Sequence, residues 1–313
     1  MLLKSRTKPN QLLALEYLTN RIELKLEHKN YLTALQKGFA GEKQFDQLTN
    51  KLNESCLVLQ DLHLELNHSH FQIDTLILTN EQVYLYEIKN YTNKYYCKDD
   101  KWFRLPEYAI DNPQAQLEKC KSKLEILLRN WNCHLPIQAK LVFVNPSFIL
   151  YHAPMNPILL FASEIGSHLN ELENPSHRSV DSRSDALAKR LIAKHNMISQ
   201  NFQTHNSLPD YTFETVKKGL RCPTCQEIFT AKTHHQRQLT CPHCSSNHSI
   251  KKLFEQACTE YEFLFSQKPL TFSLFDKWTG GCCSSKRIQR YLGKTYLKEG
   301  QGKATIYVRP LHA

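Results

Sequence analysis

The chain has 313 residues, 41% of them hydrophobic, and a formal net charge of +10, which together predict a multidomain protein with packed cores. No stretch approaches the roughly 20 consecutive apolar residues of a membrane span, and polar residues rather than a signal-peptide core follow Met1–Arg6. These features exclude a transmembrane helix and a secreted disulfide scaffold, and they predict a cytoplasmic protein without a membrane partner.

The first expected elements are helical. Leu12, Leu15 and Leu18 lie on one apolar stripe, which predicts a helical lead-in over residues 1–37. A second helix is expected over residues 40–52, where apolar residues again follow helical spacing.

Two strand-like runs, Phe71–Thr79 and Val83–Lys89, come next. Both are rich in β-branched and aromatic residues, and the polar break between them is long enough for a tight turn, so we expect a β-hairpin. In that hairpin Asp74 lies directly opposite Glu87, and Lys89 joins the same face because side chains alternate along a strand.

Facing carboxylates in an apolar sheet are costly to bury unless a cation lies between them or one takes a proton. A Mg²⁺ ion resolves this conflict, with Asp74, Glu87 and the Ile88 backbone carbonyl as ligands. The Lys89 ammonium would then orient or activate a water and offset charge on a phosphate. The alternative is a plain salt bridge between Glu87 and Lys89, which does not account for Asp74.

An Asp followed at an interval by Glu-x-Lys at the end of a strand resembles the signature of the PD-(D/E)XK nucleases, which have the restriction-endonuclease-like fold. Within that group, residues 35–145 resemble the nuclease-related domain (NERD) family. The motifs that carry the resemblance are Gly41-Glu42, Gln72-Ile73-Asp74, Glu87-Ile88-Lys89-Asn90, Trp102 and Asn112-Pro113-Gln114-Ala115-Gln116.

Two positions depart from the family pattern. Asn80-Glu81 stand where the turn often has a glycine, and Thr75 follows the Asp where a histidine is common. The resemblance implies an α/β fold with a mixed sheet flanked by helices, and a Mg²⁺- or Mn²⁺-dependent hydrolase of phosphodiester bonds.

The resemblance also implies that Glu42 and Gln116 complete the site. Glu42 lies near the expected start of the helix over residues 40–52, so a favourable interaction with the helix dipole is its alternative role. Asp111-Asn112-Pro113 predicts a helix start, which puts Gln116 one turn into the helix, within reach of a phosphate or a bound water. A plain solvated residue is the alternative for Gln116.

The rest of this region contains four expected elements: strands over 139–144 and 158–161, an exposed connector over 170–183 and a helix over 184–199. The nuclease-like domain is therefore expected over residues 38–163, followed by a helical connector over residues 164–212.

Four cysteines form two closely spaced pairs, Cys222 with Cys225 and Cys241 with Cys244. Each CxxC turn aims two thiolates at one point, and two such turns form a tetrahedral zinc site without an open position for catalysis. We therefore expect a structural Zn²⁺ in a zinc ribbon over residues 213–255. A redox dithiol is the alternative. The nearby histidines are expected at the surface rather than as ligands: His234, His235, His243 and His248.

The net charge is concentrated in the C-terminal third. Residues 213–313 contain 16 Lys and Arg against 7 Asp and Glu, whereas residues 1–212 contain 24 against 23. Residues 262–313 are expected to form a helix, a glycine turn, a basic helix and a glycine-tipped hairpin, which is typical of a winged helix-turn-helix. The alternatives are a small helical interaction module and a region whose charge only keeps it soluble. The side chains expected to bind nucleic acid are Lys286, Arg287, Arg290, Lys294 and Lys303.

Together these features predict a metal-dependent nuclease that acts on nucleic acid, with DNA as the expected substrate and a homo-oligomer as one expected assembly. Asp74 and Glu87 would bind Mg²⁺, Lys89 would position the attacking water, and Glu42 and Gln116 would assist. The alternative from another class is a non-catalytic nucleic-acid-binding or regulatory protein on the same scaffold. Metal-dependent cleavage discriminates between the two.

Overall fold

The computed structural model describes residues 1–99, 101–173, 179–199, 208–231, 236–302 and 305–310. The chain divides into two compact units, Met1–Lys8 with Thr33–Thr204, and Pro9–Leu32 with His205–Ala313. The lead-in expected over residues 1–37 is therefore not one element, because its residues are shared between the two units. None of the described helices combines the length and the apolar character that crossing a membrane requires.

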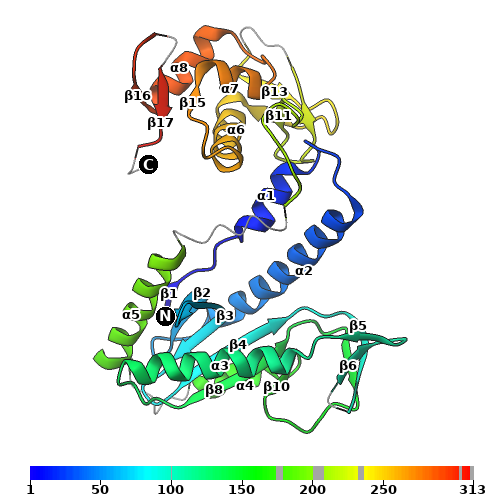
Figure 1. Cartoon of the computed structure of the whole chain (residues 1–313), viewed down its shortest axis with the longest axis vertical. Coiled ribbons are helices and arrows are strands. Elements are labelled where there is room, and N and C mark those ends of the chain that lie inside the picture. The colour runs from blue at the N-terminus through cyan, green and yellow to red at the C-terminus, as the bar shows by residue number, and fades with distance from the viewer. Residues whose placement is uncertain (100, 174–178, 200–207, 232–235, 303–304, 311–313) are drawn as a thin grey trace. The chain divides into compact units, whose positions relative to one another are not determined.

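A six-stranded mixed sheet forms the centre of the first unit (Figure 1). Its strands are, in spatial order, β1 (Leu2–Lys4), β2 (Leu57–Leu66), β3 (Ser69–Leu78), β4 (Val83–Lys89), β8 (Ile137–Phe143) and β10 (Leu159–Phe161). Strands β2, β3 and β4 are antiparallel neighbours, whereas the β1–β2, β4–β8 and β8–β10 pairs are parallel. The expected hairpin and the expected strands over 139–144 and 158–161 are thus confirmed.

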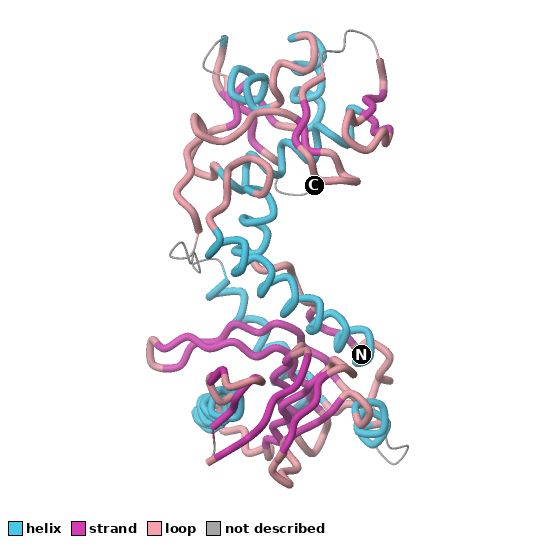
Figure 2. Tube along the Cα trace, turned by 90° about the vertical axis from the view of Figure 1, so that its right-hand side faces the viewer, coloured by secondary structure: helices cyan, strands magenta, loops and turns pink. Residues whose placement is uncertain are grey.

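Helices cover both faces of this sheet (Figure 2). The helices on one face are α3 (Pro113–Asn130) and α5 (Ser182–Ser199), and those on the other are α2 (Leu26–Thr49) and α4 (Ile165–Leu172). Leu124 and Leu191 pack into the first core, and Phe45 and Leu169 pack into the second. Because the sheet is covered on both faces, its central strands consist of nearly continuous apolar runs, and a charged side chain among them needs a compensating partner.

Helix α2 corrects one expectation from the sequence. It begins at Leu26 rather than near residue 40 and continues to Thr49. Glu42 therefore lies in its second half, and the expected position near a helix N-terminus, with its favourable dipole interaction, is wrong. A Cβ atom on Gly41 would collide with the side chain of Asn90, so glycine at this position lets α2 approach the end of β4.

A second sheet of four strands extends from the end of the first, and Figure 1 shows β5 and β6 beyond the end of β4. Its strands are, in spatial order, β7 (Tyr108–Ile110), β6 (Lys101–Arg104), β5 (Asn93–Lys98) and β9 (Phe148–Tyr151). Tyr95, Trp102 and Phe148 pack from this sheet into the first core. Burial of one face leaves the opposite face of the sheet open to solvent.

Two short hairpins open the C-terminal part of the second unit. Their strands are β11 (Leu220–Arg221) with β12 (Ile228–Phe229), and β13 (Gln238–Thr240) with β14 (Asn247–Ser249). Helix α6 (Ile250–Leu264) follows immediately, with Ser249 as its capping residue. The boundaries expected at residues 255 and 262 both fall inside this helix, so neither marks the edge of a module.

The remaining elements complete a winged-helix arrangement around α6. They are β15 (Leu270–Thr271), α7 (Phe272–Trp278), α8 (Ser285–Thr295), β16 (Leu297–Glu299) and β17 (Ile306–Val308). The three strands form one antiparallel sheet in the order β15-β17-β16. Helix α8 buries Ile288 and Leu292, as its apolar spacing predicts, and turns its basic residues outward.

A buried ion network ties the N-terminal part of the chain into this second unit. Arg21 follows α1 (Asn10–Leu18) and donates to Glu260 of α6 at 2.6 Å, and Arg221 donates to the other oxygen of the same carboxylate at 2.7 Å. All three side chains are buried. The Arg21 guanidinium also lies 3.9 Å from the centre of the Trp278 ring. Residues near the start of the chain are therefore part of the core of the C-terminal unit.

Candidate active site

The candidate active site lies where β3 and β4 separate. Their ladder runs from Leu78–Val83 to Thr75–Tyr86, which is the register predicted from the sequence. At the next position the Asp74 carboxylate accepts a hydrogen bond from the Ile88 backbone N–H at 2.7 Å. A side chain thus takes the place of a strand partner, while β4 continues to pair with β8 as far as Lys89.

Three carboxylates approach one another at this point: Glu42 from α2, Asp74 from β3 and Glu87 from β4. Asp74 and Glu87 are 9% and 4% exposed. Burial raises the pKa of Asp74 well above its usual value, and the charges of Glu87 and Glu42 raise it further. Burial likewise raises the pKa of Glu42, against the lowering effect of Arg6. The cluster therefore has an excess of negative charge that a cation would relieve.

Lys89 joins this cluster through two side-chain contacts. Its Nζ donates to Glu87 Oε1 at 2.8 Å and to Gln116 Oε1 at 3.0 Å. Burial opposes the charge on this ammonium, but the Glu87 carboxylate outweighs burial, so the pKa of Lys89 is raised. Gln116 is held in place by the predicted helix start, since the Asn112 side chain caps α3 by accepting from the Gln114 N–H. The salt bridge between Glu87 and Lys89 exists, and it is part of a larger cluster rather than an isolated surface pair.

Arg6 is the residue of this cluster that the sequence did not reveal. It follows β1, and its guanidinium donates to Glu42 Oε2 at 2.9 Å, to Asp46 Oδ2 at 3.0 Å and to the Asp74 backbone carbonyl at 2.7 Å. Its side chain is almost fully buried. No local motif surrounds Arg6, because its partners lie on α2 and β3, far away in the sequence. Asp46, one helical turn after Glu42, was the available signal.

The donor atoms fit a hard divalent cation. Asp74 and Glu87 supply carboxylate oxygens. The side chain of Ile88 lies in the second core, and its backbone carbonyl is the third ligand expected from the sequence. Mg²⁺ takes one or two carboxylates and completes its shell with water and substrate oxygens. Three or more His, Cys, Asp or Glu side chains can together hold a metal when their ligand atoms lie within 4.8 Å of one another. Among the described residues, these carboxylates do not form such a group. A metal here would therefore rest on two carboxylates and on backbone and solvent oxygens.

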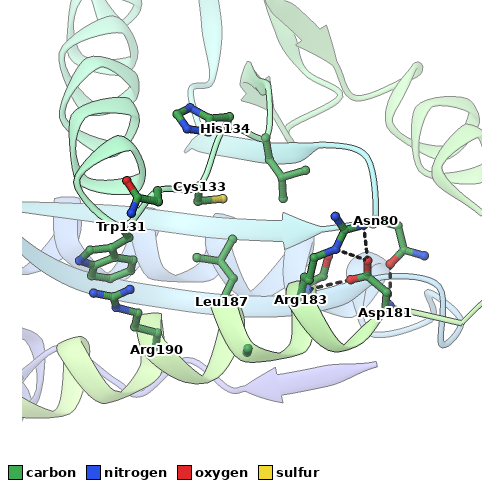
Figure 3. Close-up of a pocket in the computed structure, with 12 residues that line it drawn as sticks. Asn80, Trp131, Cys133, His134, Asp181, Arg183, Leu187 and Arg190 are labelled. Carbon is green, nitrogen blue, oxygen red and sulfur yellow. Dashed lines mark hydrogen bonds and ion pairs between the residues drawn. The ribbon is translucent and has the colours of Figure 1, made fainter.

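A cavity of about 650 Å³ lies at the other end of β4 and contains none of these residues (Figure 3). It is formed by Asn80 in the β3–β4 turn, by Trp131 after α3 and by the start of α5. The Arg190 guanidinium lies 4.3 Å from the centre of the Trp131 ring. Arg183 pairs with Asp181 at 3.0 Å, and Asp181 caps α5. The lining of this cavity includes none of Glu42, Asp74, Glu87, Lys89 and Gln116, so the cavity is separate from the candidate active site.

The four cysteines of the second unit come together in the cluster that the sequence predicts for a metal site. The sulfur atoms of Cys222 and Cys244 lie 3.6 Å apart, those of Cys225 and Cys241 lie 3.7 Å apart, and all four lie within 4.8 Å of one another. Thiolates around a tetrahedral Zn²⁺ lie about 3.8 Å apart, because each Zn–S bond is about 2.3 Å long. The cluster therefore fits a closed structural zinc site.

Two of the nearby histidines can be compared with the expectation. His243 is exposed as expected, but His248 is half-buried, and its Nε2 lies 3.5 Å from Cys222 Sγ and 2.8 Å from Ser246 Oγ. His234 and His235 lie outside the described residues.

A basic pocket of about 310 Å³ lies between the zinc ribbon and α8. Arg287, Arg290 and Lys294 line it from α8, which agrees with their expected outward position. Two cations that were not expected join them: Arg237, just before β13, and Lys251, in the first turn of α6. The predicted residue Lys286 is exposed but does not line this pocket, and Lys303 lies outside the described residues.

A mixed six-stranded sheet flanked by helices, with buried carboxylates and a lysine where two strands separate, defines a nuclease-like α/β fold. Residues 37–144 match the family model of the nuclease-related domain. The chain therefore carries a nuclease-related domain, as the sequence motifs predicted, over roughly a third of its length. No curated protein matches the chain.

Among solved structures, the crystal structure of protein VC1899 from Vibrio cholerae matches 52% of this chain at 13% identity, with a TM-score of 0.23. The match spans half of that protein's length (50%). A similarity at this TM-score carries no argument about fold or function.

Proposed function

We propose that this protein is a metal-dependent nuclease that hydrolyses phosphodiester bonds in nucleic acid, with DNA as the expected substrate. The observation that supports the proposal is the convergence of Asp74, Glu87, Lys89 and Gln116 where β3 and β4 separate. This cluster lies within the region that matches the nuclease-related domain. Two buried carboxylates, Asp74 and Glu87, and a half-buried third, Glu42, repel one another, which is costly in a fold that performs no reaction.

Each residue has a role that follows from its contacts. Asp74 and Glu87, with the Ile88 carbonyl, would hold a Mg²⁺ or Mn²⁺ ion, which supplies a Lewis acid when bound. The Lys89 ammonium, kept charged by Glu87 and oriented by Gln116, positions the attacking water and stabilises charge on the phosphate. Glu42 would assist at the edge of the site, where its salt bridge with Arg6 at 2.9 Å offsets part of the negative charge of the cluster.

The test compares Lys89→Ala and Asp74→Asn with Lys140→Ala. Lys140 lies on the neighbouring strand β8 and donates a hydrogen bond to the Pro157 carbonyl at 2.7 Å. Purified proteins are incubated with linear, circular and single-stranded DNA in Mg²⁺ or EDTA. We expect Mg²⁺-dependent cutting by the wild type and by Lys140→Ala, and a loss of about a hundredfold or more in the two site variants. Equal cutting by all four proteins would refute the assignment. Salt-dependent binding by the wild type without any cutting would favour the non-catalytic alternative.

We further propose that the basic pocket of the second unit binds the phosphate backbone. Each cation that contacts a phosphate releases a counterion, so the affinity falls with salt in proportion to the number of contacts. Arg237→Ala and Arg290→Ala should each reduce the slope of log affinity against log salt by about one. Lys268→Ala is the control, because Lys268 pairs with Glu214 in the same unit and does not line this pocket. An unchanged slope in both pocket variants would favour the interaction-module alternative.

A further inference from the structure

The open face of the second sheet displays a row of aromatic side chains on adjacent strands. Tyr96 on β5 lies opposite Phe103 on β6 and opposite Tyr151 on β9. The rings of Tyr96 and Phe103 stack with centroids 4.9 Å apart and planes at 12°. Tyr151 is 43% exposed, and Ile149, two residues earlier on the same strand, is 44% exposed. Large apolar side chains on a solvated face commonly mark a binding surface.

Strand alternation explains why this row faces solvent. Tyr95 and Trp102, which flank the row in the sequence, are buried in the first core, so Tyr96 and Phe103 must lie on the other side of the sheet. On this outer side Tyr96 and Phe103 are half-buried and Tyr151 is exposed, so each ring presents part of its surface to solvent.

The charged residues on the strands that carry the row are basic, whereas the turn between β5 and β6 contains Asp99. Lys94 and Lys98 share the alternation of Tyr96 along β5, and Lys101 shares that of Phe103 along β6; all three are exposed. None of the four strands contains an acidic residue. Aromatic rings flanked by lysines on a four-stranded sheet complement a polyanion that carries flat, unpaired bases.

The sheet also adjoins the candidate active site. Strand β5 begins shortly after Lys89, the last residue of β4. The segments that precede β5 and β9 are joined by a hydrogen bond from Asn145 Nδ2 to Asn90 Oδ1 at 3.0 Å. The sheet that carries the row is therefore joined directly to the strand that carries Glu87 and Lys89.

We propose that this open face is a stacking platform for single-stranded nucleic acid, with Tyr96, Phe103 and Tyr151 under successive bases and the lysines on the phosphates. The proposal rests on the proposed nuclease function and deepens it, since it makes single-stranded nucleic acid the substrate that binds beside the catalytic residues. Duplex bases are already stacked on one another, so they cannot occupy this surface without melting.

The test measures binding of the full chain in EDTA, so that no substrate is cut. The first probe is a fluorescent oligothymidine of about twelve nucleotides. The second is an oligonucleotide of equal length and charge whose central nucleotides lack their bases. Loss of one base–aromatic stack weakens binding about tenfold, so we expect Tyr96→Ala and Tyr151→Ala to weaken oligothymidine binding by about that factor without changing binding of the abasic probe. The control is Tyr108→Ala on the same sheet. Tyr108 is 71% exposed but pairs with Arg104 and so follows the opposite alternation.

Photocrosslinking with 5-iodouracil in the oligonucleotide gives a second readout, because crosslinked peptides should contain Tyr96 or Tyr151. Crosslinks confined to residues 213–313, or equal affinity of the wild type for the two probes, would overturn the proposal. Weakening by Tyr108→Ala equal to that by Tyr96→Ala would also overturn it. Failure of the nuclease assignment is separable, because it would remove cleavage in Mg²⁺ and leave these binding differences in EDTA unchanged.

Discussion

Replacing Glu260 by glutamine tests the ion network that closes the core of the second unit. The Glu260 carboxylate is fully buried and forms salt bridges with two buried guanidinium groups, those of Arg21 and Arg221, at 2.6 Å and 2.7 Å. Glutamine has nearly the same shape but no charge, so Glu260→Gln leaves two buried cations without a counter-charge.

The size of the effect follows from burial. Removing one partner of a buried pair costs about 3–5 kcal/mol, which is a large share of the 5–15 kcal/mol that stabilises a typical domain. Glu255→Gln is the matched control on the same helix: its partner Lys251 lies 3.6 Å away, and both side chains are more than half exposed. An exposed pair of this kind contributes about 0.3–0.5 kcal/mol. We therefore expect a difference of about 3 kcal/mol or more between the two variants.

Native-state hydrogen exchange is the suitable assay, because a chain with two units has no single free energy of unfolding. Peptides from α6 and α7 report on the second unit, and those from β2 and β3 report on the first. Only the peptides from α6 and α7 should lose protection in Glu260→Gln. The loss should persist at high salt, since buried charges are poorly screened. A loss no greater than that in Glu255→Gln would refute the reasoning, as would an equal loss in both units.

Three further predictions follow. Protein purified without chelator should contain about one Zn²⁺ per chain, lost when Cys222 and Cys225 are both replaced by serine; elemental analysis that finds no zinc in the wild type would reject this site. Arg6→Met should destabilise the first unit by about 3–5 kcal/mol, measured by hydrogen exchange of peptides from β2 and β3, because it removes the buried cationic partner of Asp46 and Glu42. Lys43→Met, which removes an exposed partner of Asp46, should cost less than about 1 kcal/mol; similar losses in the two variants would contradict this account. Burial lowers the pKa of His195 from 6.5 to about 4, so as the pH falls the unfolded chain binds a proton at this histidine before the folded chain does. The stability that the neutral His195 contributes is therefore full above about pH 6.5 and is lost as the pH falls toward 4. Hydrogen exchange in α5 that does not change across this range would argue against a buried neutral imidazole.

The sequence by itself determined the local features and the short-range register. Alternation and a two-residue turn were enough to set the register of β3 against β4 from Leu78–Val83 to Thr75–Tyr86, because pairing in a hairpin is fixed by its turn. A capping asparagine and a proline were enough to begin α3 and so to direct Gln116 toward Lys89. The CxxC spacing likewise determined the four-sulfur cluster, since each pair of ligands lies within one turn of chain.

Tertiary structure decided the features that depend on partners far apart in the sequence. Arg6 meets Glu42 and Asp46 only because β1 pairs with β2, and no local pattern encodes that pairing. Arg21 belongs to the second unit for the same reason, since its partner Glu260 is 239 residues away.

Two further features also needed the assembled chain. Helix α2 extends further toward the N-terminus than its apolar spacing indicated, because that stretch of the helix has few buried residues to produce a periodic signal. Arg237 and Lys251 lie beside α8 because the ribbon packs against the winged helix. In each case the sequence supplied the chemical groups, and the packing of distant segments decided which of them meet.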